Sequence, residues 1–69
     1  MMDIKLYMVV GVFDTVDPDV KLINIAGHGF DVCYIYRGEI SRGDLVTIDE
    51  NDNARRVVID INSGKVMFV

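Results

Sequence analysis

Residues 27–48 read GHGFDVCYIYRGEISRGDLVTI, and this stretch decides the fold class. Two runs rich in β-branched and aromatic residues, 30–36 and 45–49, flank a connection that contains Gly38 and Gly43. Such residues favour strands, and glycines within the connection allow the bends of a barrel corner. The stretch therefore predicts two strands joined at a corner, with Ile40 filling the core between the glycines.

The rest of the chain repeats this strand-and-turn pattern. Alternation is cleanest over 54–61, where Val57, Ile59 and Ile61 are expected to face inward and Arg56 and Asp60 outward. Short strands at intervals of roughly 8 to 12 residues are typical of barrels and sandwiches. The sequence predicts an all-β fold, a compact barrel of five or six strands. The expected strands are residues 5–13, 20–26, 30–36, 45–49, 54–61 and 66–69, with a loop at 14–19.

Size and composition indicate one small domain, residues 1–69, with 51% hydrophobic residues and a dense core. The single Cys33 excludes an intrachain disulfide, predicts a reducing compartment and is expected to be a small buried hydrophobe. The uncharged run 6–13 is far shorter than the roughly 20 residues of a membrane helix. Residues 1–5 lack the basic region of a signal peptide. We therefore expect a cytoplasmic protein with no membrane association.

The glycine pattern carries a family resemblance that covers residues 23–59. A strand ends at the turn Gly27-His28-Gly29, the segment 38–48 reads Gly-x-Ile-x-x-Gly-Asp-x-Val-x-Ile, and a charged loop and another strand follow. This order resembles the β-barrel second domain of translational GTPases of the elongation factor Tu type. SH3-like barrels have similar corners and are the alternative fold.

The resemblance implies a stand-alone binding barrel. In the family this barrel packs on a GTPase domain and helps hold the acceptor end of tRNA. On matching positions, the resemblance makes the turn Gly27-His28-Gly29 and the connection around Arg37 and Arg42 the candidate contacts. The chain has no Gly-x-x-x-x-Gly-Lys-Ser/Thr motif, so no GTPase activity is carried over.

No residue set has the spacing of a catalytic or metal site. Asp49, Asn51 and Asn53 match the first ligand positions of a calcium loop, but Ala54 stands where that loop requires glycine. An ordinary polar turn is expected there. No serine or cysteine stands at a sequence spacing from His28 that indicates a catalytic pair. The segment Gly27-His28-Gly29 is expected to be a tight turn with an exposed imidazole. We expect a protein that is not an enzyme and takes no cofactor and no metal.

Charge bears on the choice of partner. The net charge of −4 disfavours RNA, yet four arginines in the second half could form an RNA-contacting face with Tyr34 and Tyr36. The alternative is that these arginines pair with the acidic residues of the same loops. The uncharged run 66–69 would invite aggregation as a free edge, so it is expected to pair, either closing the barrel or across a dimer.

These observations predict a non-catalytic binding module whose partner is another protein. The alternatives are an RNA- or tRNA-contacting barrel and a structural homo-oligomer. The candidate partner-binding residues are Gly27, His28, Gly29, Arg37, Arg42, Arg55 and Arg56.

Overall fold

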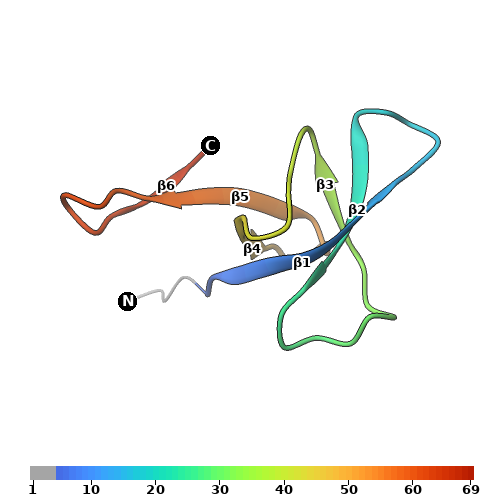
Figure 1. The fold of residues 1–69 in the computed structure, drawn as a ribbon, viewed down its shortest axis with the longest axis horizontal. Helices are drawn as coiled ribbons and strands as arrows, with labels where there is room; N and C mark the ends of the chain where they lie inside the picture. Colours follow the sequence, from blue (N-terminus) through green and yellow to red (C-terminus); the bar gives the residue numbers. More distant parts are fainter. Residues whose placement is uncertain (1–4) are drawn as a thin grey trace.

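The structure, a computed structural model, describes residues 5–69. The prediction that residues 1–5 lack a signal-peptide region falls largely on residues 1–4, which lie outside the described part. Six antiparallel strands form one sheet in the order β3-β2-β1-β4-β5-β6 (Figure 1). The all-β prediction is confirmed. The strands are β1 (Tyr7–Asp14), β2 (Val20–Ile25), β3 (Tyr34–Arg37), β4 (Leu45–Ile48), β5 (Ala54–Ile59) and β6 (Val66–Phe68).

β1 holds the two halves of the sheet together. Its first residues pair with β4, where Tyr7 lies opposite Val46, and the rest pairs with β2. The register with β2 shifts between Val9 and Gly11, which marks a β-bulge. Because a bulge bends a strand and increases its twist, the two halves run in different directions, and Figure 1 shows β5 and β6 leading away from β2.

The predicted barrel does not close in the part of the chain that the structure describes. β3 and β6 are the edge strands. One isolated parallel bridge joins Ile35 of β3 to Asn53, the residue before β5, beside a hydrogen bond from Ile35 N to Asp52 O at 3.1 Å. The reason is that β3 ends after four residues. Gly38, at φ +117°, then donates its N–H to Asp19 O at 2.9 Å, on the side of β2. The fold is therefore a curled, open sheet.

The core lies on one face of this sheet. Val9, Ile23, Ile25, Tyr34, Ile40 and Val46 form its buried cluster. Ile40 is 8% exposed between Gly38 and Gly43, which both have positive φ, so the predicted corner is confirmed. Glycine adopts positive φ without the steric penalty that other residues meet there.

Of the three residues predicted to face inward within residues 54–61, only Val57 is buried. Val57 is 2% exposed, but Ile59 is 45% and Ile61 93% exposed. β5 ends at Ile59, and Ile61 lies in the turn before β6. The β5–β6 hairpin extends beyond the core, and no other strand within residues 5–69 lies beside its far end (Figure 1).

The strand predicted over residues 30–36 begins only at Tyr34. Residues 30 and 31 form a turn, and Val32 N donates to Gly29 O at 3.0 Å. The side-chain amide of Asn24, and not the backbone of a neighbouring strand, donates hydrogen bonds to this segment. Its Nδ2 donates to the carbonyls of Phe30 and Val32 at 3.2 and 3.0 Å. Cys33 is consequently exposed, and its predicted burial is wrong.

Candidate functional site

The β5–β6 arm, defined as residues 54–69, presents apolar side chains on an edge strand. β6 is the last strand of the sheet and reads Val66-Met67-Phe68, with no charged residue. Soluble proteins usually protect such an edge with charges, proline or a covering segment. Large hydrophobic residues exposed on the arm are Val58, Ile59, Ile61, Met67, Phe68 and Val69. The arm is therefore a candidate site for partner binding.

The hydrogen bonds of the arm show which backbone groups of β6 are free. Asp60 N donates to Lys65 O at 2.9 Å and Val69 N donates to Arg56 O at 3.1 Å, so residues 65 and 69 face β5. Backbone groups alternate in direction along an antiparallel strand. The N–H and C=O groups of Val66 and Phe68 therefore point away from β5, toward the free edge.

An apolar row crosses the outer face of the sheet and ends at this edge. Met8 lies opposite Leu45, Leu45 opposite Val57, and Val57 opposite Phe68. These side chains alternate with core residues such as Val46 and therefore point to the other face. We call them the outer apolar row. The row connects the buried Val57 to the half-exposed Phe68 at the edge.

Arg55 lies over the end of the outer apolar row. Its Cζ is 4.0 Å from the centroid of the Phe68 ring, which is a cation–π contact. Such a contact restricts both side chains and keeps the faces of guanidinium and ring together. The free edge thus carries a positive charge beside an aromatic ring.

The turn of the arm depends on the carboxylate of Asp60. Its Oδ1 accepts a hydrogen bond from Asn62 N at 2.9 Å, and this N–H, followed by the Ser63 hydroxyl, lowers the pKa of Asp60 below its ordinary value of 3.8. Because the pKa of Asp60 is lower in the folded state than in the unfolded state, its ionised carboxylate stabilises the fold at pH values above the unfolded-state pKa. This stabilisation is lost as pH falls through the folded-state pKa.

We therefore expect the carboxyl carbon of Asp60, followed by NMR against pH, to titrate below 3.8 in the folded protein. The same carbon in urea-unfolded protein is the control and should titrate at its ordinary value. Equal midpoints in the two states would show that the turn does not hold the carboxylate.

Three of the four predicted arginines come together. Arg37, Arg55 and Arg56 line a hollow of about 380 Å³ where the ends of β3 and β5 meet, which we call the seam hollow. The Nε of Arg56 is buried without a hydrogen bond, 3.4 Å from Asp44 Oδ2. Among residues 5–69, the contact between Arg56 and Asp44 is the one ion pair found of those expected for these arginines.

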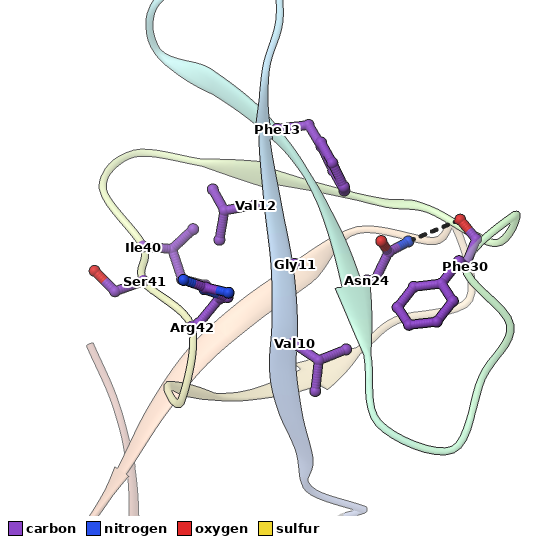
Figure 2. Close-up of a pocket in the computed structure, with 9 residues that line it drawn as sticks. All are labelled: Val10, Gly11, Val12, Phe13, Asn24, Phe30, Ile40, Ser41 and Arg42. Carbon is purple, nitrogen blue, oxygen red and sulfur yellow. Dashed lines mark hydrogen bonds between the residues drawn. The ribbon is translucent and has the colours of Figure 1, made fainter.

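Arg42 lies apart from the seam hollow. It lines a second hollow of about 500 Å³ around Gly11, together with Asn24, Phe30 and Ile40. Figure 2 shows Ile40 and Arg42 on one side of β1 and Asn24 and Phe30 on the other. A Cβ at Gly11 would lie 2.9 Å from Asn24 Oδ1, so a larger residue at this position would crowd the Asn24 side chain.

The turn Gly27-His28-Gly29 borders neither of these two hollows. Gly27 has φ +86°, as expected of a tight turn. His28 Nδ1 lies 2.8 Å from the Tyr34 hydroxyl oxygen, and the imidazole packs edge-on against Tyr7 and Tyr34. The side chain of His28 thus contacts the aromatic end of the core, away from the arginines.

Asn24 is a structural residue that the pattern analysis missed. It is 1% exposed and its amide holds the 30–33 turn. The available signal was a polar residue between Ile23 and Ile25 in the otherwise apolar run 22–26. A buried amide needs hydrogen-bond partners, so such a position predicts a side chain that organises nearby backbone.

Residues 49–53 form the ordinary turn that was expected in place of a calcium loop. Asp49 Oδ1 accepts hydrogen bonds from the backbone N–H groups of Asn51 and Asn53 at 2.8 and 2.9 Å. Residues 5–69 contain no group of three or more His, Cys, Asp or Glu side chains placed to hold a metal ion. They also contain no helix long and apolar enough to cross a membrane.

Neither the family models, nor the curated proteins, nor the solved structures with which the chain was compared contain a match to it. The resemblance to the second domain of translational GTPases therefore stays a prediction.

Proposed function

We propose that this chain is a non-catalytic protein-interaction module that binds an extended partner segment along the free edge of β6. The observation that carries the proposal is the outward direction of the N–H and C=O groups of Val66 and Phe68 on an uncharged edge strand. Strand addition of this kind uses backbone hydrogen bonds for affinity and alternate side chains for specificity.

The outer apolar row supports this mode of binding. A strand added beside β6 would extend the row beyond Phe68, so every second side chain of the partner would contact apolar surface. Ile59 and Val66 lie opposite each other next to the row and add to that surface. We expect a partner segment with apolar residues at alternate positions.

The test is a substitution that blocks the edge and leaves the arm intact. Val66 is the first residue of β6 and its N–H points outward, so Val66→Pro removes a donor to the partner but no hydrogen bond to β5. We expect affinity for a captured partner to fall at least about tenfold, the effect of losing about 1.4 kcal/mol. Calorimetry with the purified partner gives this ratio.

The matched control is Val66→Ala, which shortens the same side chain and keeps the N–H. It should retain most of the affinity. A proline variant that binds as the wild type does would contradict strand addition at β6.

A second copy of the chain is the alternative partner. Antiparallel pairing of two β6 strands about Met67 would set Val66 opposite Phe68 of the other copy, with the outward groups of both in hydrogen-bonding positions. The structural homo-oligomer predicts a sedimentation mass that rises with concentration and does not rise in Val66→Pro. A constant mass favours a different protein.

An RNA-contacting barrel related to translation-factor domain II is a second candidate. It is supported by the common hollow of Arg37, Arg55 and Arg56 and by the corner of Gly38, Ile40 and Gly43. Against it, Tyr34 is 8% exposed, which leaves its ring little surface for base stacking. RNA binding through arginines would weaken steeply with salt, whereas strand addition would not.

A further inference from the structure

Two arginines are placed side by side by the bridge between β3 and β5. Ile35 and Asn53 form a parallel bridge, and Arg37 and Arg55 each follow two residues later. Residues two apart in extended chain point to the same side. The side chains of Arg37 and Arg55 therefore point to the same side of the backbone, and both line the seam hollow.

Asp49, the acidic residue that lines the hollow with this pair, forms no ion pair with either arginine. Its Oδ1 accepts the N–H groups of Asn51 and Asn53. Asp44 lies against Arg56. Within residues 5–69, neither Arg37 nor Arg55 forms an ion pair. The seam hollow therefore presents Arg37 and Arg55 outside any ion pair, together with the carboxylate of Asp49, on a chain of net charge −4.

Arg55 is already positioned for a ligand. Its guanidinium lies over the Phe68 ring at 4.0 Å, which uses the face of the group and leaves its N–H edge available. Restricting a flexible side chain before binding reduces the entropy lost when the ligand binds.

We propose that the seam hollow binds the phosphate group of a small phosphate monoester, with Arg37 and Arg55 as paired donors. A planar carboxylate is satisfied by one guanidinium, whereas a tetrahedral dianion has oxygens enough for two. The hollow, about 380 Å³, is within the range of small-molecule sites. Ile35 and Tyr36 supply apolar wall for the organic part of the ligand. This site does not depend on strand addition at β6.

The test is an NMR titration of backbone amides with phenyl phosphate and, separately, inorganic phosphate at constant ionic strength. We expect saturable shifts confined to the amides of residues 35–37 and 53–56. Arg37→Gln and Arg55→Gln should each weaken binding about tenfold, since each removes a charge-assisted contact. Arg42→Gln, which removes the same charge from the other hollow, is the matched control and should bind as the wild type does.

A second pair of variants separates the guanidinium geometry from simple charge. Arg37→Lys and Arg55→Lys keep the charge and lose the planar set of donors, so each should weaken binding measurably. Lysine variants that bind as the wild type does would overturn the paired-donor site. So would equal weakening by Arg42→Gln, or shifts that do not saturate. Binding of a single-stranded RNA oligonucleotide without binding of either phosphate would overturn it in favour of an RNA surface.

Discussion

The Ile23→Ala variant is expected to lose a large part of the stability of the fold. Ile23 is fully buried in the core cluster, and truncating a buried isoleucine to alanine costs about 2 to 5 kcal/mol because a cavity remains. At roughly 0.05 to 0.15 kcal/mol per residue, a domain of this size has only about 3 to 10 kcal/mol of stability in total. Urea unfolding followed by circular dichroism should show a much lower midpoint, or no folded baseline at all.

The control is the same truncation at the other end of the chain. Ile61 is 93% exposed in the turn of the β5–β6 arm, so Ile61→Ala should change the free energy of unfolding by no more than about 0.5 kcal/mol. The alternation pattern placed Ile61 inside. Equal losses of unfolding free energy in Ile23→Ala and Ile61→Ala would therefore favour a buried Ile61, as the alternation pattern predicts, over the exposed Ile61 of the structure.

The Asn24→Asp variant is expected to lose about 3 kcal/mol or more at neutral pH. It preserves the size of the side chain but replaces the Nδ2 donor with an oxygen, which would face the carbonyls of Phe30 and Val32 in a site 1% exposed. An unpaired buried charge typically costs about 3 to 5 kcal/mol. The 30–33 turn should become mobile first, because the amide of Asn24 is what holds it.

Urea unfolding and amide hydrogen exchange of residues 30–33 measure this loss. Part of the stability should return in acid, since a protonated carboxyl can again donate one hydrogen bond. Asn62→Asp, at an exposed position of the β5–β6 turn, is the control and should be nearly neutral. Unchanged exchange in Asn24→Asp would show that the turn does not depend on this side chain.

The local signals for strands and corners were reliable. Composition and turn residues predicted a strand within a few residues of each of the six observed ones. The corner at 38–43 was predictable because positive φ is a property of single residues and glycine is the residue that adopts it freely. Ile40 was predictable as core because it is the apolar residue between two such bends.

The orientation of side chains was less predictable. Alternation separates two faces of a strand, but which face is covered depends on strands elsewhere in the chain. Val57 was predicted to face inward; it is buried, yet it lies in the outer apolar row, away from the core cluster. Cys33 is exposed because the side chain of Asn24 holds residues 30–33 in a turn.

The candidate sites divide in the same way. The sequence by itself determined an all-β chain, a glycine corner around Ile40 and an uncharged strand, predicted at 66–69 and found at Val66–Phe68, because these follow from local backbone preference and composition. The tertiary structure alone decided that the sheet formed by residues 5–69 stays open, with β6 as one of its edges, and that Arg37 and Arg55 line one hollow while Arg42 lines another. These features depend on contacts between distant segments, above all the Ile35–Asn53 bridge and the bend of β1, and a residue pattern carries no information on which segments meet.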